Sequence, residues 1–441
     1  MFSAFKKFGR MGGGSSIPWT PTKLFAAGEK GGLWDFSTLA NLYQDSAGTT
    51  PCTAVGQPIG KVLDTSGRGN HLTQATSTKR PTLGRMPATG VRNLLTYTED
   101  FSNAVWGKAG MGYSGSTLIP TAVSSQHFIS INTPQSGTPA NTLSIVAKAA
   151  GYHWLGLAVS SGGVCTFDLL NGVVGTTNTT GGTPSIVSIG GGYYRCSLTR
   201  NYATQTSYVF VEPDDSQATW TPDGISGIEV YPQLELGSTP TAYQKVGAAY
   251  DVTESGVASV YTAYFDGVDD CLVSPSIDFT GTDKMSVFAG ARKVDDTAGV
   301  AAELSTDVTF NQGNFYLVSG TDAGHTGWQA LSGGSIAATS GQVAYSTISG
   351  PDTAVLSSQH NIPGDLSTIR RNGVAGTSGT GDKGTGNFGN YPIYVGQRAA
   401  ATLPYKGFLS ALCTRGAATD AALVTSMEKW LAARTPGVTL P

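Results

Sequence analysis

Only one stretch of this 441-residue chain argues clearly for an α-helix by the spacing of its apolar residues. From Asp420 to Arg434, apolar side chains recur three or four positions apart, and Pro436 follows as a stop signal. These side chains are Leu423, Met427, Trp430 and Leu431. Elsewhere the apolar runs are short and end at Gly, Pro, Asn or Asp, which is typical of strands joined by turns. We therefore expect an all-β protein with one amphipathic helix near its C-terminal end.

Short strands and their turns can be located along the chain. Leu143–Lys148, Tyr208–Val211 and Met285–Ala289 are apolar or alternating runs of the length of a sandwich strand. Asn372-Gly373 is the pair that favours the positive φ angles of a two-residue hairpin turn, so we predict a β-hairpin near residue 372. The tract 376–390 is rich in Gly, Ser and Thr and is predicted to be a long exposed loop.

Charge and cysteine content exclude several classes of function. Charged residues make up 13% of the chain and the net charge is -3, whereas binding to nucleic acid needs clustered Lys and Arg. No apolar run approaches about 18 residues, so membrane insertion is not expected. The cysteines are odd in number and form no C-x-x-C pair, which argues against a disulfide framework and a zinc site. We expect the five to be buried as small apolar residues: Cys52, Cys165, Cys196, Cys271 and Cys413.

Motifs near the two ends of the chain belong to one pattern. The earlier part contains Leu33-Trp34-Asp35-Phe36, Tyr43–Pro51 and Asp64-x-Ser66-Gly67-x-Gly69-Asn70-His71. The later part contains Tyr264-Phe265-Asp266-Gly267-x-Asp269-Asp270, Tyr394–Arg398, Tyr405–Leu409 and Glu428–Ala432. Taken together they resemble the concanavalin A-like (laminin-G-like) jelly roll of bacteriophage and prophage virion proteins. The resemblance implies that one sandwich is built from two separated segments.

The middle of the chain has motifs of its own. They are Asn93-Leu94-Leu95-x-Tyr97-x-Glu99-Asp100-Phe101-Ser102-x-x-x-Trp106, Gly191–Leu198 and Gln233-Leu234-Glu235-x-Gly237-Ser238-x-Pro240-x-x-Tyr243. This part resembles the head-spike and tail-fibre module of phages, a jelly roll similar to carbohydrate-binding modules. We therefore expect two jelly-roll β-sandwiches, one inserted into the other. The expected segments are 1–20 (a docking arm with a Gly/Ser hinge), 21–92 (first part of the concanavalin A-like sandwich), 93–247 (the insert) and 248–441 (the remainder, with the helix).

The two resemblances also imply a function. They indicate a virion structural protein, made in the host cytoplasm, that forms a short fibre or spike on the head or tail surface and binds a host glycan. The partners expected are other virion proteins, which the N-terminal arm would contact, and further copies of the chain in a homotrimer. The arm residues expected to dock are Phe2, Phe5, Lys6, Lys7, Phe8 and Arg10. Two alternatives stay open: a glycan-degrading tail spike, and a capsid decoration protein without a ligand.

Aromatic and acidic residues supply the candidate binding sites. Tyr152, Trp154 and Trp220 are candidates for stacking on a sugar, because glycan sites pair apolar walls with a few polar groups. The other interpretation of such aromatics is that they fill the core, which we favour for Trp106 and Tyr194. Calcium takes several carboxylate oxygens on a flexible loop. A calcium site is therefore possible at Asp64, Asp266, Asp269 and Asp270, the alternative being an Asp-Gly turn with solvated carboxylates.

No catalytic residue is predicted. The chain has no G-x-S-x-G or H-E-x-x-H motif, and its five histidines show no ligand spacing. A glycosidase needs two carboxylates across a cleft, yet no Glu-x-Asp-x-Glu strand occurs. Glu212 is interpreted as the end of a strand that enters a turn. We therefore expect a protein that is not an enzyme and needs no cofactor other than, at most, calcium.

Overall fold

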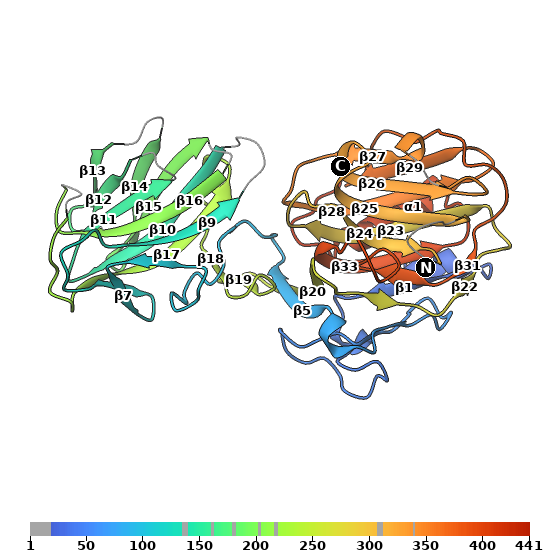
Figure 1. Cartoon of the computed structure of the whole chain (residues 1–441), viewed down its shortest axis with the longest axis horizontal. Helices are drawn as coiled ribbons and strands as arrows, with labels where there is room; N and C mark the ends of the chain where they lie inside the picture. The colour runs from blue at the N-terminus through green and yellow to red at the C-terminus, as the bar shows by residue number, and fades with distance from the viewer. Residues whose placement is uncertain are drawn as a thin grey trace, which may run out of the picture.

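The computed structural model describes residues 19–134, 140–159, 163–178, 182–201, 204–215, 219–306, 312–337 and 340–441. Figure 1 shows two β-rich lobes, one formed by the middle of the chain and the other by both of its ends. Strands dominate this part of the chain, which confirms the all-β prediction. Its one α-helix is α1 (Ala421–Ala432), and it also has four short 3-10 turns: η1 (Pro21–Phe25), η2 (Leu39–Asn41), η3 (Ser77–Lys79) and η4 (Ser340–Gln342).

The lobe formed by the middle of the chain contains two six-stranded antiparallel sheets. The first, sheet D, has the order β14 (Thr183–Gly190), β15 (Tyr193–Asn201), β10 (Ala140–Ala150), β17 (Gly227–Leu236), β8 (Thr117–Pro120) and β7 (Met111–Ser114). The second, sheet C, has the order β13 (Val173–Thr177), β12 (Cys165–Asp168), β11 (Trp154–Val159), β16 (Thr204–Glu212), β9 (Phe128–Pro134) and β6 (Gly107–Ala109). Buried side chains from both sheets form one core, among them Leu143, Ile145, Leu155 and Phe167.

The other lobe is a larger sandwich. One sheet, sheet A, has the order β30 (Val374–Ala375), β29 (Leu366–Arg371), β28 (Asp352–Asn361), β23 (Lys284–Lys293), β33 (Lys406–Arg415), β20 (Ser259–Asp266) and β5 (Thr82–Pro87), and β1 (Gly31–Asp35) also pairs with β33. The facing sheet, sheet B, has the order β2 (Leu42–Tyr43), β3 (Lys61–Val62), β4 (Leu72–Thr73), β21 (Leu272–Val273), β32 (Ile393–Val395), β24 (Gly299–Leu304), β25 (Asn314–Asp322), β26 (His325–Gly333) and β27 (Ala344–Thr347). A small ladder joins β22 (Ile277–Asp278) to β31 (Asn390–Tyr391).

The larger sandwich is built from segments that lie on either side of the smaller one in the sequence. Strand β1 pairs with β33, with Trp34 opposite Leu412, and β5 pairs with β20, with Leu83 opposite Ala263. All four residues belong to one buried cluster. At the crossing point between the lobes, β18 (Gln244–Val246) pairs with β19 (Val252–Glu254). The chain therefore leaves this sandwich after β5 and rejoins it at β20.

Local predictions can be checked one by one. Helix α1 begins where expected, because the Asp420 side chain accepts a hydrogen bond from the amide of Leu423 at 2.9 Å, which satisfies a free N–H of the first turn. Asn372 and Gly373 both have positive φ and connect β29 to β30, so the predicted hairpin is confirmed. The five cysteines are buried and free, as expected.

The prediction of a long exposed loop at 376–390 is wrong in part. Its backbone forms hydrogen bonds along the edges of the sandwich, for example between Gly379 and Ser367 and between Thr377 and Tyr345. The tract also buries Phe388 in the core. Composition identified the absence of regular strands, but it could not show that the backbone polar groups would find partners on neighbouring strands.

Candidate functional site

An aromatic surface covers the outer side of sheet C in the smaller sandwich. Side chains alternate between the faces of a strand, and in β11 the residues Leu155 and Leu157 point into the core, so Trp154 faces outward. On the neighbouring strands three further rings face the same way and contact one another. We call these four residues the aromatic face: Phe128, Trp154, Tyr208 and Phe210.

The rings of the aromatic face are arranged by cross-strand pairing. Phe128 lies opposite Phe210, with ring centroids 5.1 Å apart, and Tyr208 lies 5.4 Å from Phe128. Phe210 is buried among its neighbours, whereas Phe128, Tyr208 and Trp154 are half-buried. Gly156 is the partner of Phe210 on β11, and a Cβ there would lie 3.0 Å from Cβ of Phe210. A glycine is required at this position because the adjacent side chains leave no space for another carbon.

Carboxyl groups flank Trp154 on both neighbouring strands. Its backbone is in register with Glu212 on β16 and with Asp168 on β12. Glu212 is 5% exposed, and burial, followed by the charge of Asp214, raises its pKa to about 7. Burial also acts to raise the pKa of Asp168, but hydrogen bonds from Asn171 and other donors hold it below its usual range. Asp168 is 4% exposed and its oxygens are engaged by these donors, so the two carboxyl groups border the Trp154 ring from buried positions.

A further carboxylate lies behind the Trp154 ring. Asp215 accepts hydrogen bonds from the hydroxyl of Thr166 and from both the amide and the hydroxyl of Thr176, the latter two at 2.7 and 2.9 Å. A Cβ added at Gly175 would lie 2.4 Å from Oδ1 of Asp215 and 2.7 Å from Cζ3 of Trp154. Gly175 therefore lets the indole and this carboxylate approach each other closely.

The other two candidate aromatics lie together, but in a different place. Tyr152 and Trp220 pack edge to face with ring centroids 4.8 Å apart, and the Tyr152 hydroxyl accepts a hydrogen bond from the amide of Asp223 at 3.0 Å. Trp220 also packs against the ring of His127, at 5.3 Å. Among the described residues, no ring contact joins this pair to Trp154. The three residues predicted to bind a glycan therefore lie at two separate sites, Trp154 at one and Tyr152 with Trp220 at the other.

The two aromatics favoured as core residues can also be located. Trp106 is 2% exposed, packs against Phe101 and donates its indole N–H to the carbonyl of Tyr97 at 2.9 Å. Tyr194 is half-buried and packs against the same core. Both therefore belong to the framework of the smaller sandwich.

Sequence reasoning missed a polar group on the outer side of sheet D. The hydroxyls of Tyr193 and Tyr231 both donate to Glu229, at 2.9 and 2.5 Å, and the Lys148 ammonium lies 4.9 Å from the centre of the Tyr193 ring. The hydrogen bond to Glu229, followed by burial, raises the pKa of Tyr231 to about 12. Alternation on β15 and β17 could have indicated that these side chains face outward, but only the strand pairing brings them together.

A groove beside this group explains two of the motifs. Its cavity of about 640 Å³ is lined mainly by hydroxyl-bearing side chains of β14 and β15 and by the loop 238–242. Arg195 donates a hydrogen bond to the carbonyl of Thr241, and the Glu235 carboxylate accepts from the amide of Thr241 at 3.0 Å. Gln233 in turn donates to Glu235 at 2.7 Å. The motif residues therefore hold this loop against the sheet.

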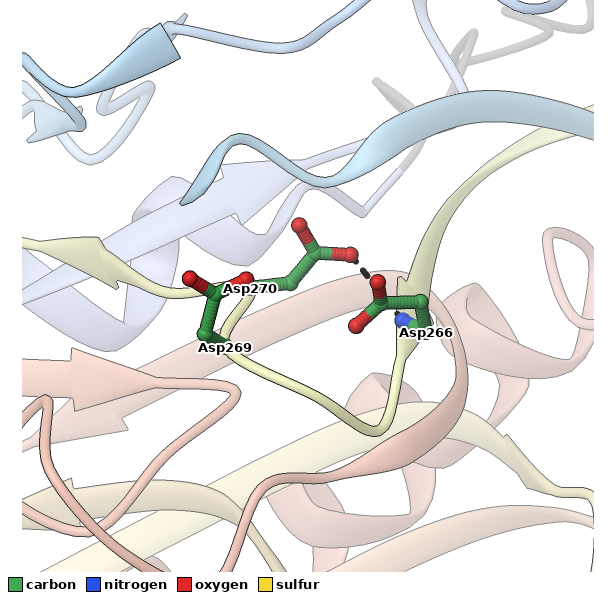
Figure 2. Close-up of side chains that lie close together, drawn as sticks. All are labelled: Asp266, Asp269 and Asp270. Atoms are coloured by element: carbon green, nitrogen blue, oxygen red, sulfur yellow. Dashed lines mark hydrogen bonds between the residues drawn. The ribbon is translucent and has the colours of Figure 1, made fainter. Parts of the chain in front are cut away.

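Three of the four residues proposed for calcium lie together. Asp266, Asp269 and Asp270 surround the loop after β20, and each offers an oxygen within 4.8 Å of the others (Figure 2). The Asp270 carboxylate accepts a hydrogen bond from the amide of Asp266 at 2.9 Å, which closes the turn. Burial is the main cause that raises the pKa of Asp270 to about 7, and the two neighbouring charges add to it. Calcium would need several further oxygens beyond these three carboxylates, so the turn and the metal site both stay possible.

The inclusion of Asp64 in that site was wrong. The described residues that cluster here do not include it. Its carboxylate accepts hydrogen bonds from the amides of Leu33, Ser66 and Asn70, at 2.9, 2.8 and 2.9 Å, and the side chain is 8% exposed. This carboxylate fixes the loop between β3 and β4 onto β1, which explains the motif without a ligand.

The predicted docking residues of the arm lie outside the described residues: Phe2, Phe5, Lys6, Lys7, Phe8 and Arg10. In the part of the chain that is described, no helix combines the length and the apolar character needed to cross a bilayer.

Comparisons with known proteins give little. No protein-family model and no curated protein matches the chain. Among solved structures, a candidate carbohydrate-binding protein from Bacteroides ovatus is 12% identical, with a TM-score of 0.27, over 70% of this chain and 80% of its own. A Trypanosoma rangeli sialidase in complex with the inhibitor DANA is 10% identical, with a TM-score of 0.29, over 85% of this chain and 68% of its own. At these scores the likeness carries no argument about function.

Proposed function

We propose that this protein is a non-enzymatic bacteriophage virion protein that forms a short surface fibre or spike, and that its smaller sandwich binds a host glycan through the aromatic face. The motifs of both sandwiches, which resemble those of phage appendage proteins, support the virion role. The nesting of one all-β sandwich within the other fits that resemblance.

The observation that carries glycan binding is the environment of Trp154. A sugar ring has an apolar face of C–H groups, which stacks on an indole, and a rim of hydroxyls, which need placed polar partners. Trp154 is half-buried on an outer sheet face, and its strand partners Glu212 and Asp168 place carboxyl groups at its two sides. This combination suits a saccharide better than a purely apolar ligand.

A glycan array tests this proposal. We expect the wild-type protein to bind a subset of bacterial surface glycans and Trp154→Ala to lose that signal while its thermal unfolding remains cooperative. Tyr113→Ala is the matched control, because Tyr113 is an exposed aromatic residue of the same lobe on sheet D, 42% accessible. Loss of binding with Tyr152→Ala but not with Trp154→Ala would move the site to the Tyr152–Trp220 pair and contradict the assignment.

The virion role needs a separate experiment. Cryo-electron microscopy of the whole particle should locate the chain on the head or the tail, with residues 1–20 contacting other virion proteins. Mass photometry of the purified protein should give the mass of three chains per complex if the homotrimer is correct. A monomer in solution and absence from the particle would contradict both parts of the proposal.

One observation favours the glycan-degrading alternative. Glu212 holds its proton up to about neutral pH beside Trp154, as a general acid must. Glu212 does not line the groove on sheet D, however, and its flanking partner Asp168 is buried with its oxygens engaged by Asn171 and Leu170. Release of reducing ends from a bound glycan by wild-type protein, abolished in Glu212→Gln, would establish hydrolysis.

A further inference from the structure

A cavity of about 390 Å³ lies where the two lobes meet. Its floor is the end of sheet A, and its other walls come from the smaller sandwich, including Leu94 and Thr133, and from the returning linker at Ala249. Figure 1 shows β5, β20 and β19 where the two lobes meet. We call this cavity the interlobe pocket.

The floor of the interlobe pocket follows from strand register. Tyr264 on β20 lies opposite Phe408 on β33, and Phe408 lies opposite Arg292 on β23. Their sequence neighbours Ala263, Leu409 and Ala291 belong to the core of the larger sandwich. Because side chains alternate, the row of Tyr264, Phe408 and Arg292 faces away from that core and into the pocket. Two aromatic rings, 4.9 Å apart, and one guanidinium therefore form a continuous strip.

Arg292 is the unusual member of this row. Its side chain is 8% exposed and makes one hydrogen bond, from Nη1 to the hydroxyl of Thr353 at 3.0 Å. The nearby Asp352 is engaged elsewhere, since it accepts hydrogen bonds from Arg371 at 2.9 Å and Trp328 at 2.8 Å. Among the described residues, Arg292 forms no ion pair with a carboxylate.

Two other buried cations of the larger sandwich do have direct counter-ions. Lys293, the next residue, lies 2.6 Å from Asp296, and Arg415 lies 2.6 Å from Glu29. Burial lowers the pKa of Arg292 to about 10, so it still carries its charge at neutral pH. A guanidinium has five N–H donors, and a buried charge without a partner is costly. An anion that entered the pocket would relieve this cost.

The rest of the pocket restricts what that anion can be. Lys406, on the rim, is paired with Asp295 at 2.8 Å, so this pair adds no net charge. The second negative charge of a dianion such as phosphate would therefore find no counter-ion among the described residues that line the pocket. Phe408, Leu94 and Val294 offer an apolar wall. The pocket therefore suits one negative charge attached to an apolar body.

We propose that the interlobe pocket binds a small monocarboxylate with an apolar body, its carboxylate paired with Arg292 and its hydrocarbon part packed against Phe408 and Leu94. A planar carboxylate matches the two parallel N–H groups of a guanidinium. Because floor and walls belong to different sandwiches, a bound molecule also ties the two lobes together. This site is separate from the aromatic face and does not depend on glycan binding.

Octanoate is the probe, titrated into the full chain by isothermal calorimetry at pH 7, with 1-octanol as its neutral analogue. We expect octanoate to bind the wild type and to bind Arg292→Gln at least about tenfold more weakly, the loss expected for a charged hydrogen bond. Lys284→Gln is the matched control, because Lys284 is a half-exposed cation at the far end of the same strand, and it should bind as the wild type does. 1-Octanol should bind about as weakly as octanoate binds Arg292→Gln.

A second variant keeps the test decisive if Arg292→Gln does not fold. Ala249 is exposed at the pocket wall, so Ala249→Trp places an indole in the cavity without touching Arg292, and it should abolish octanoate binding. No binding of octanoate to folded wild type at millimolar concentration would overturn the proposal. Equal affinity of Arg292→Gln, or of Ala249→Trp, for octanoate would overturn it as well.

Discussion

Asp270 is a buried carboxyl group whose ionisation should oppose folding. Its pKa is raised to about 7 by burial and by Asp266 and Asp269, so the folded state binds its proton more tightly than the unfolded chain does. Stability is therefore lost as the pH rises from about 4 to about 7. We expect Asp270→Asn, which keeps an acceptor oxygen for the amide of Asp266, to gain about 1–3 kcal/mol at pH 8 and nothing at pH 4 in urea unfolding. A destabilised variant, with wild-type melting raised by calcium, would instead indicate a metal site.

Lys383 should show the opposite dependence on pH. Its side chain is fully buried, and its ammonium has no hydrogen-bond partner among the described residues. Burial lowers its pKa to about 8, so the folded state holds this proton less tightly than the unfolded chain. The penalty is complete below about pH 8 and fades towards pH 10.5. We expect Lys383→Met to be more stable by about 1–2 kcal/mol at pH 7, with the gain shrinking at pH 10, as measured by urea unfolding. An unchanged gain at both pH values would disprove this cause.

From the sequence it is easier to predict which face of a strand a side chain points to than to predict which residues it contacts. Alternation in β11 places Trp154 outward without any structure, because Leu155 and Leu157 must face the core. That Tyr152 contacts Trp220 depends on segments about seventy residues apart in the chain. The same limit explains the error at Asp64, since its amide partner Leu33 comes from another strand. Contacts of this kind depend on the completed fold and have no local signal.

Helix α1 is attached to the larger sandwich by a buried acidic residue as well as by apolar packing. Glu428 is 2% exposed and accepts hydrogen bonds from Ser357 at 2.6 Å and from Arg370 at 2.8 Å. Removing it leaves the buried hydroxyl of Ser357 and the partly exposed Arg370 without this acceptor, so we expect Glu428→Ala to cost about 1–3 kcal/mol. Thr425→Ala, on the exposed side of the same helix, should change stability by less than about 0.5 kcal/mol. Equal effects of the two substitutions on urea unfolding would show that Glu428 does not hold the helix.

The helix and the hairpin, which have local sequence signals, could be predicted, but the order of the strands in the sheets could not. The helix has an N-cap and apolar spacing, and the hairpin has an Asn-Gly pair, so both could be located from a few residues. The strand runs Leu143–Lys148 and Met285–Ala289 lie within β10 and β23. Strand order has no such signal: β1 and β20 both pair with β33, which lies far away in the sequence. Only the resemblance to known motifs, rather than residue periodicity, indicated that the two ends of the chain belong together.

On the scale of the whole molecule, the two linkers between the sandwiches are bound to each other. Gln244 accepts a hydrogen bond from the amide of Arg92 and donates to the carbonyl of Gly90, both at 2.8–2.9 Å. Arg92 forms an ion pair with Glu254 at 2.6 Å, and Asn93 donates to the carbonyl of Gln244 at 2.9 Å. The outgoing and returning chains are therefore fixed side by side. This arrangement lets a sandwich be inserted without separating the strands on either side of it.

Because the insert has its own core and the two linkers lie together, each sandwich should fold without the other. The two main buried clusters share no residue, and the strand pairs of sheets C and D are all internal to the insert. We expect residues 91–247 expressed alone to unfold cooperatively, and the chain with 94–243 replaced by a short Gly-Ser loop to retain α1 and its near-ultraviolet circular dichroism. Each fragment lacks the contacts between the lobes, so its melting temperature should lie a few degrees below that of the same sandwich in the full chain. A shift of this size corresponds to a loss of about 1 kcal/mol in stability. Fragments that stay unfolded, while the full chain unfolds in a single calorimetric transition, would show that the sandwiches form one cooperative unit.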